Sequence, residues 1–312
     1  MPRKPHSRIT DGVFAAVIRD YMRTSPKWLQ PPPVGYSDAT KGAWKRELDL
    51  AARPEILGAK SIFEMRPALT QAFLDGLANR PGKQANAYTA LKQLEKWAMV
   101  RDRLPHHIMT GVEVAGVQGG HRPWPDDRVE LAERHARADF ARVVTLAANT
   151  GQRESDLVKM RWSDIEIVGG RPGINVVQKK TNKQLWIPFT RQLAGILDTW
   201  QLQPGFILRN LRGDQWNAQA LSSAWRHHRR ANKALELLQE EGLVLHGLRA
   251  TACVRLNQSG ANTRQISDWV GMSERTVERY LRFSIQKENA LAAVVHLDRF
   301  DLGRKLLKNN GA

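Results

Sequence analysis

The chain has 312 residues, of which 42% are hydrophobic and ten are tryptophan, so it can fill the cores of two ordinary domains and is not a disordered chain. Its 48 lysines and arginines against 31 aspartates and glutamates give a net charge of +17. This charge is spread through folded-looking segments, which favours nucleic acid as the partner over a membrane surface. Cys253 is the only cysteine, which excludes intrachain disulfides and a thiolate zinc cage. No apolar run approaches the length of about 20 residues that crosses a bilayer, and "MPRKPHSRITDG" lacks a signal-peptide core, so we expect a cytoplasmic, nucleoid-associated protein.

The N-terminal third contains helical patterns after an ambiguous start. Residues 1–38 combine "DGVFAAVIRDYM", typical of a helix, with the proline-rich "SPKWLQPPPVGYS", typical of an extended linker. From residue 39 the apolar spacing becomes regular, and Pro67 opens one of the helices. Lys92 and Lys96 fall on a face apart from the apolar one. The pattern predicts a small all-helical module over residues 39–104 with a basic surface.

A second domain follows a break in the periodicity. Residues 105–125 hold prolines, a Gly-Gly pair and no helical period, so we expect an interdomain linker there. Residues 126–312 begin with a long helical hairpin and then carry three short strands within "IEIVGGRPGINVVQKKTNKQLWIPF", separated by glycine-rich and lysine-rich turns. The remainder is helical, and the tail "QKENALAAVVHLDRFDLGRKLL" contains an amphipathic helix. The expected fold class is mainly α with a small three-stranded β-sheet.

Two motifs in this domain place cations at turns. In "NTGQRESDL" a Thr-Gly turn places Arg153 at a helix start with Asp156 one turn on, and in "QKKTNKQ" Lys180 lies at the tip of a turn between strands. Each has an ordinary explanation, because Arg153 could simply pair with Asp156 and a turn lysine is usually just solvated. Neither motif is specific alone.

Two further motifs lie in the C-terminal helical part. In "LHGLRATACVRL", His246 and Arg249 share one helix face, and Tyr280 follows in "DWVGMSERTVERYLRF". His246 could be a satisfied structural histidine. Val277, Tyr280 and Leu281 have the i, i+3, i+4 spacing of a core-facing helix, so Tyr280 alone could be a packing residue.

Together, in this order and context, the four motifs resemble the tyrosine recombinases, the phage integrase family. The resemblance covers about residues 39–300, and "GGHRPWPDDRV" and "TGQRESDLVKMRWSDI" are similar to the start of this family's catalytic domain. It implies a two-domain DNA clamp, with a helical core-binding DNA-binding domain over residues 39–104 and a catalytic domain over 126–312 whose tail helix packs on its own domain or on a neighbouring protomer. It also implies a phage or mobile-element enzyme that acts without metal or cofactor, as a homotetramer on two double-stranded DNA recombination sites. The residues expected to contact DNA are Lys92, Lys96 and Arg229.

The resemblance assigns catalytic roles to Arg153, Lys180, His246, Arg249 and Tyr280. Two permanently charged guanidiniums, on Arg153 and Arg249, can clamp the non-bridging phosphate oxygens while charge builds there. Tyr280 is the nucleophile, and ionising a phenol at pH 7 costs about 4 kcal/mol. His246 is the expected proton acceptor, and Lys180 the expected proton donor to the departing 5′-oxygen.

One position departs from the family's pattern. Members usually carry His or Trp where "VGMS" places Met272, and the spacing to Tyr280 is about one residue shorter than usual. Methionine cannot donate a hydrogen bond to phosphate. Either the site lacks one donor, for which Trp269 or Ser273 could substitute, or the loop is rebuilt and Met272 points into the core. Two other functions stay open: a monomeric type IB topoisomerase-like relaxing enzyme, and a catalytically silent DNA-binding protein of the same fold.

Overall fold

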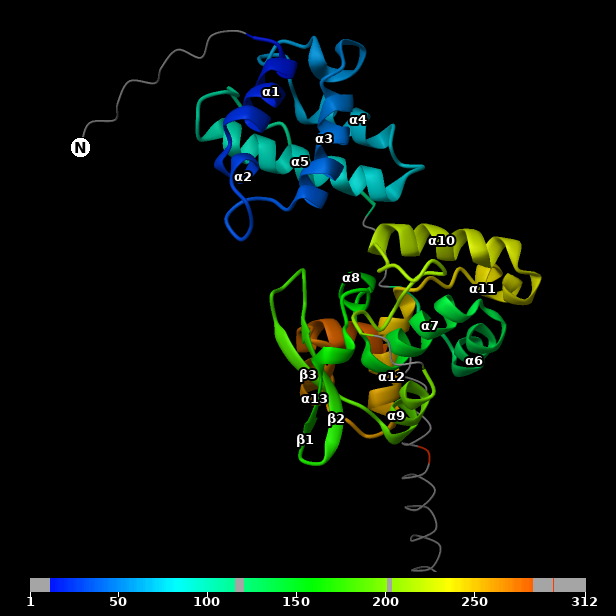
Figure 1. Ribbon diagram of the computed structural model, residues 1–312. Helices are drawn as coiled ribbons and strands as arrows, with labels where there is room; N and C mark the ends of the chain where they lie inside the picture. Colours follow the sequence, from blue (N-terminus) through cyan, green and yellow to red (C-terminus); the bar gives the residue numbers. More distant parts are fainter. Residues whose placement is uncertain (1–11, 116–120, 201–203, 283–293, 295–312) are drawn as a thin grey trace, which may run out of the picture. The chain divides into compact units, whose positions relative to one another are not determined.

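The computed structural model describes residues 12–115, 121–200, 204–282 and 294, and the chain divides into two compact units, 1–118 and 119–312 (Figure 1). Each unit has a hydrophobic core of its own. The described part of the first unit contains helices and turns only. Its elements are α1 (Phe14–Thr24), α2 (Pro26–Leu29), α3 (Asp38–Ala51), the π-helical turn η1 (Pro54–Gly58), α4 (Pro67–Asp75) and α5 (Pro81–Met99).

The N-terminal segment belongs to the core of the first unit. Phe14, Ile18 and Tyr21 on α1 are fully buried, which follows from their helical spacing. The Tyr21 hydroxyl hydrogen-bonds that of Tyr36 at 3.1 Å, which ties the proline-rich stretch to the same core. The sequence left residues 1–38 undecided because the prolines interrupt the apolar pattern, yet from residue 12 onward they are part of this unit.

Several described residues of the expected linker, residues 105–125, pack into the cores of the two units. Ile108 is fully buried, and the backbone N–H groups of Ile108 and Met109 donate to Oε1 of Glu95 at 2.7 and 3.1 Å. At the other end, Trp124 is 2% exposed within the core of the second unit. The sequence missed this because one buried carboxylate satisfies an irregular backbone, which leaves no periodicity to detect.

The second unit is helical around one small sheet. Its elements are α6 (Asp126–His135), α7 (Ala138–Thr150), α8 (Glu154–Leu157), the 3₁₀ turn η2 (Trp162–Asp164), β1 (Ile165–Val168), β2 (Arg171–Val177), β3 (Gln184–Pro188), α9 (Arg191–Asp198), α10 (Ala218–Ala231), the 3₁₀ turn η3 (Lys233–Leu235), α11 (Glu236–Glu240), α12 (Gly247–Gln258) and α13 (Thr263–Val270). Residues 274–282 form a further helical stretch. The fold class expected from the sequence is confirmed.

The strands form an antiparallel sheet in the order β1-β2-β3, with Ile174 at the centre opposite Ile165 and Ile187. α13 contacts β3, and α7 packs against α12 (Figure 1). A C-terminal cluster, separate from the main core, holds Cys253, Ile266, Val270, Met272, Val277 and Leu281. These contacts bring the helix ends and the hairpin between β2 and β3 to one region.

The expected helical hairpin after residue 126 is shorter than the sequence indicated. α6 and α7 form it, but "QRESDLVKMRWSDI" gives only one turn of α8 and one 3₁₀ turn before the sheet. The amphipathic tail helix lies outside the described residues. No helix in the described ranges is both long and apolar enough to span a membrane.

Candidate active site

A tight turn between α7 and α8 positions Arg153. α7 ends at Gly151, whose backbone is left-handed (φ 64°) and where a Cβ atom would lie 2.7 Å from Cγ1 of Val270. Glycine alone meets both conditions without strain. Arg153 is then the N-cap residue of α8; its Nη1 donates to Oε1 of Gln178 at 3.2 Å and lies 3.7 Å from Oδ2 of Asp156. Because Asp156 is 1% exposed, a buried carboxylate fixes one side of the guanidinium.

Arg249 lies in the first turn of α12 and is 2% exposed. Its Nη1 donates to the carbonyl of Gly151 at 2.5 Å, whereas its Nη2 is buried and has no hydrogen-bond partner among the described residues. Burial and, next, the nearby Arg153 lower the pKa of Arg249 to about 10, so it is still a cation at neutral pH. A buried cation with an unused donor is costly unless an anion accepts from it. This side chain is therefore suited to hold a phosphate oxygen.

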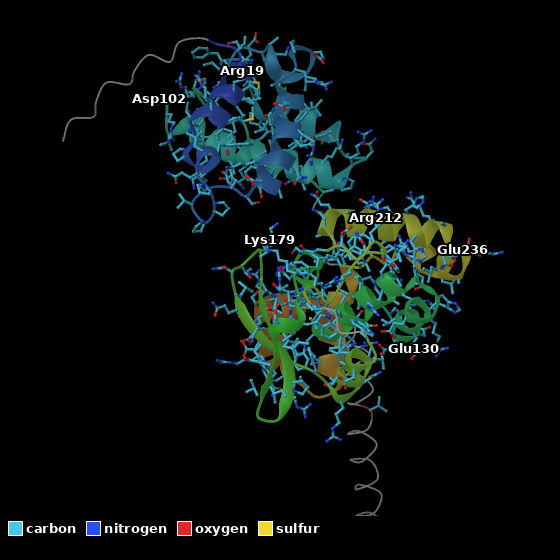
Figure 2. The ribbon with its side chains drawn as sticks, viewed as in Figure 1. Arg19, Asp102, Glu130, Lys179, Arg212 and Glu236 are labelled. Carbon is cyan, nitrogen blue, oxygen red and sulfur yellow. The ribbon has the colours of Figure 1, made fainter. Side chains whose placement is uncertain are left out.

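Lys180 lies in the turn of residues 178–183 that joins β2 to β3, and it is exposed. The base of this turn is fixed, because the buried Gln178 side chain donates to the carbonyl of Val270 at 2.9 Å. Figure 2 labels the neighbouring Lys179 at the end of the hairpin. Lys180 thus extends a flexible side chain from an anchored turn.

His246 directly precedes α12 and is half-buried. The pKa of His246 is lowered to about 4, first by burial and then by electrostatic interaction with His121, Arg249, Arg153 and Lys180. The imidazole is therefore neutral at pH 7, the form that can accept a proton. Its ring lies edge-on to that of His121, with centroids 4.7 Å apart and planes at 69°.

Tyr280 lies on the helical stretch 274–282 and is half-buried. Val277 and Leu281, the neighbours expected to face a core, are buried in the C-terminal cluster, and Tyr280 packs at its edge. The ordinary packing interpretation thus accounts for Val277 and Leu281. The tyrosine ring stays at the border between the cluster and the surface.

Met272 is 8% exposed and belongs to the C-terminal cluster, and its carbonyl accepts from Oγ of Ser267 at 2.6 Å. Of the two expected substitute donors, the Trp269 indole N–H already donates to the carbonyl of Asn149 at 3.3 Å. Ser273 is exposed on the site. The geometry therefore favours a packing role for Met272. Of the two expected substitute donors, Ser273 is the one that lines the cleft.

All six residues expected at the site line one surface cleft of about 880 Å³. They come from four separate segments of the second unit, and the remaining lining residues are mostly polar. The cleft is lined by Arg153, Lys180, Thr181, Lys183, His246, Arg249, Ser267, Gly271, Met272, Ser273, Glu274, Thr276 and Tyr280. Within the described ranges, no group of three or more His, Cys, Asp or Glu side chains is arranged to hold a metal ion.

The residues expected to contact DNA differ in what their side chains do. Lys92 and Lys96 on α5 are exposed, and Nζ of Lys92 lies 5.6 Å from the Tyr88 ring centroid. Nη1 of Arg229 instead donates to the carbonyl of Leu238 at 3.1 Å and to that of Leu243. These bonds hold the Arg229 guanidinium to its own domain, and its expected contact with DNA stays a prediction.

Comparison with known proteins identifies the family. A family model described as "Phage integrase family" matches residues 130–287, just over half of the chain. The chain belongs to this family. It is thus a tyrosine-type site-specific recombinase by family. No curated protein sequence matches the chain.

Solved structures share the fold of this integrase-family chain at low sequence identity. A lambda integrase dimer bound to a COC′ core site matches with a TM-score of 0.68 and 19% identity, over 87% of this chain and 77% of that one. The Tn1549 transposon integrase in complex with circular intermediate DNA matches with a TM-score of 0.63 and 12% identity, over 86% and 94%. XerH recombinase in a post-cleavage complex with a difH substrate matches with a TM-score of 0.60 and 14% identity, over 82% and 79%.

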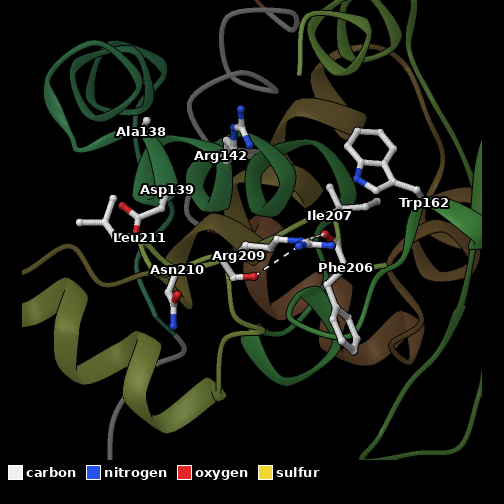
Figure 3. A pocket seen from close by; sticks show the side chains of 10 residues that line it. Ala138, Asp139, Arg142, Trp162, Phe206, Ile207, Arg209, Asn210 and Leu211 are labelled. Carbon is white, nitrogen blue, oxygen red and sulfur yellow. Dashed lines mark hydrogen bonds between the residues drawn. The ribbon is translucent and has the colours of Figure 1, made fainter. Parts of the chain in front are cut away.

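A second cavity of the integrase, of about 300 Å³, lies away from these residues (Figure 3). Arg209 in its wall donates to the carbonyls of Phe206 and Gly213 at 3.3 and 3.4 Å. Asp139 pairs with Arg137 at 2.7 Å. Arg209 and Asp139 in the wall of this cavity are therefore held by other groups of the chain, and this cavity offers no nucleophile.

Two contributors to the site were not predicted from the sequence. Gln178 accepts from Arg153 and also from Oγ1 of Thr181, at 2.9 Å, so it links the arginine to the lysine turn. The other is His121, which contacts His246. Gln178 directly precedes "KKTNK", which is a weak signal; nothing in the sequence links His121 to a residue 125 positions later.

Proposed function

We propose that this chain cuts and rejoins duplex DNA at specific sites through a 3′-phosphotyrosyl intermediate. The observation that carries the proposal is the cleft, where Tyr280 shares one surface with two arginines, a lysine and a neutral histidine. Phosphoryl transfer to a side chain needs a nucleophile, a proton acceptor, a proton donor and clamps for the developing charge. The cleft supplies one candidate for each.

In the proposed cleavage step, the phenol oxygen of Tyr280 attacks the scissile phosphorus, and the bond to the 5′-oxygen of the next nucleotide breaks. The phenolic proton passes to His246, and Lys180 gives a proton to the leaving oxygen. Arg153 and Arg249 hold the two non-bridging oxygens, where charge accumulates. Religation reverses these transfers, with a free 5′-hydroxyl attacking the phosphotyrosine.

The electrostatics of the cleft favour His246 as the proton acceptor in this step. Three of the influences that lower the pKa of His246 are the cations Arg249, Arg153 and Lys180. A phosphodiester anion held among them opposes their effect and raises the pKa of His246, so the imidazole becomes a stronger base once substrate is bound. Met272, which has no donor, packs beneath the tyrosine helix.

The proposed partners are double-stranded recombination sites on nucleoid DNA, held two at a time by a homotetramer. The lambda integrase structures support this, since they include a dimer on a core site and a tetramer on a Holliday junction. Lys92 and Lys96 are the proposed phosphate-binding residues of the first unit. Changing both to Gln should reduce the slope of log K against log salt by about 0.9 for each phosphate that is no longer neutralised. Lys45→Gln, at a side chain that already pairs with Asp49 at 2.6 Å, should leave the slope unchanged.

A catalytically silent DNA-binding protein is the second candidate, and the observation that favours it is the buried Met272. A nicked suicide duplex decides between them, because cleavage beside the nick releases a short strand and traps the covalent complex. The proposal expects a covalent adduct with the parent protein. A protein that binds the duplex and never forms the adduct is the silent one. A topoisomerase-like enzyme would relax supercoiled plasmid without paired sites, whereas a recombinase requires two.

A further inference from the structure

The segment before α6 is fastened to the helix that carries Arg249. The backbone N–H of Trp124 donates to Oγ1 of Thr251 at 2.7 Å, and that hydroxyl donates back to the carbonyl of Trp124 at 3.1 Å. The Trp124 indole N–H donates to the carbonyl of Val244 at 2.8 Å, just ahead of His246. Three hydrogen bonds thus hold residues 121–124 across the start of α12.

Gly247 makes this close approach possible. A Cβ atom at this position would lie 2.4 Å from the carbonyl oxygen of Arg122, a distance that backbone atoms do not tolerate. Glycine is therefore required directly after His246 for the segment to pass over the helix start. The residue that the segment brings beside His246 is His121.

The contact with His121 is the one aromatic contact that the His246 ring makes in the described part of the chain. No hydrogen bond reaches either ring nitrogen from these described residues, and the ring lies edge-on to His121 at 4.7 Å between centroids. Both rings border a cavity of about 190 Å³, whose wall includes Glu154 and Ser222. The Ser222 hydroxyl donates to the Glu154 carboxylate, which fixes that carboxylate in the wall of this cavity.

We propose that His121 is a positioning residue for His246, holding the imidazole by edge-on ring packing in the orientation that faces the nucleophile. A general base must meet the proton at hydrogen-bond distance, and most catalytic histidines are oriented by a hydrogen bond to a carboxylate or carbonyl. In this chain, ring packing against His121 takes the place of that orienting hydrogen bond. The inference rests on the proposed function, because it assumes that His246 acts in strand cleavage.

The test is single-turnover cleavage of a nicked suicide duplex at saturating enzyme. His121→Ala should slow cleavage by roughly 2- to 10-fold, the range expected for the loss of one aromatic pair, with unchanged DNA affinity. His121→Phe keeps a ring edge and should cleave within about 2-fold of the parent, whereas His121→Leu, of similar size but without a ring, should behave like the alanine variant. In a His246→Asn background, His121→Ala should cause no further loss, because a residue that acts through His246 has nothing left to position.

Several results would overturn the inference. They are an unchanged rate in His121→Ala, a leucine variant as fast as the phenylalanine variant, a full additional loss in the His246→Asn background, or a loss confined to DNA affinity, which would make His121 a phosphate-binding residue. Cleavage by the parent protein distinguishes a failure of the His121 inference from a failure of the proposed function. If the parent forms no adduct, the proposed function fails; if it does and the variants do not differ, only the role of His121 fails.

Discussion

Replacing Arg249 by methionine should strongly slow cleavage and at the same time stabilise the second unit. The guanidinium is 2% exposed, one of its terminal nitrogens has no partner in the described part of the structure, and its pKa falls from 12.5 to about 10. Because the folded-state pKa of this cation lies below its ordinary value, the charged form opposes folding at all pH values below about 10. The shift corresponds to about 3 kcal/mol at 1.36 kcal/mol per unit. Loss of the hydrogen bond to the Gly151 carbonyl lowers this gain in the free energy of unfolding by roughly 1–2 kcal/mol.

The net expectation is a gain of about 1–2 kcal/mol in the free energy of unfolding, since methionine fills a similar volume without a charge. For a unit of this size each kcal/mol moves Tm by about 2–4 °C. Thermal unfolding followed by circular dichroism measures the gain, and single-turnover cleavage should fall by roughly 10²–10³, as for removal of one donor to a developing anion.

Arg255→Met is the matched control on the same helix, because Arg255 is partly exposed and pairs with Asp126 at 2.7 Å. It should change the free energy of unfolding by less than about 1 kcal/mol and leave cleavage intact. A destabilised Arg249→Met variant would refute the reasoning, because it would show that the guanidinium contributes more to the fold through its contacts than its burial costs.

Three further results are expected. Lys180→Ala should slow cleavage by about 10²-fold, and a substrate with a 5′-bridging sulfur should restore the rate, because a thiolate leaves without a proton; an unrestored rate would assign Lys180 another role. Met272→His should lower Tm without raising the cleavage rate, since an imidazole placed in the C-terminal cluster is buried without a partner at a cost of about 1–3 kcal/mol; a faster enzyme would mean that a phosphate donor had been missing. His246 has a folded-state pKa of about 4, below the ordinary value near 6.5, so the unfolded chain binds the proton more readily in that window and stability should rise as pH increases from 4 to 6.5. His246→Asn should flatten that rise in urea titrations, and an equally steep rise in the variant would locate the effect elsewhere.

The residues that the sequence predicted for the site come together in the structure, and their catalytic roles stay predictions. The spacing of Arg153, Lys180, His246, Arg249 and Tyr280 carried the family resemblance, and all five line one cleft. Motif spacing works here because Arg153, Lys180, His246 and Arg249 lie at or beside the ends of elements, where a local signal such as Thr-Gly or a lysine-rich turn marks the place. The three strands and most helices followed from the same local patterns.

What the sequence could not predict depends on contacts between distant segments. Glu95 holds the backbone of residues 108–109, which fixes the start of the expected linker in the first unit. Arg229 is of a residue type that commonly contacts DNA, and in the structure it donates to two carbonyls of its own domain. His121 lies beside His246 only because Gly247 lets two segments meet. None of these contacts produces a repeating pattern in the sequence.

The central claim is that the Tyr280 hydroxyl becomes covalently joined to DNA. Trapping the protein on a nicked suicide duplex, followed by proteolysis and peptide mass mapping, tests it most directly. The account predicts a nucleotide adduct on the peptide that contains Tyr280, and no adduct from Tyr280→Phe although that variant binds the duplex as the parent does. An adduct mapped to Tyr88, or one that persists in Tyr280→Phe, would contradict the account.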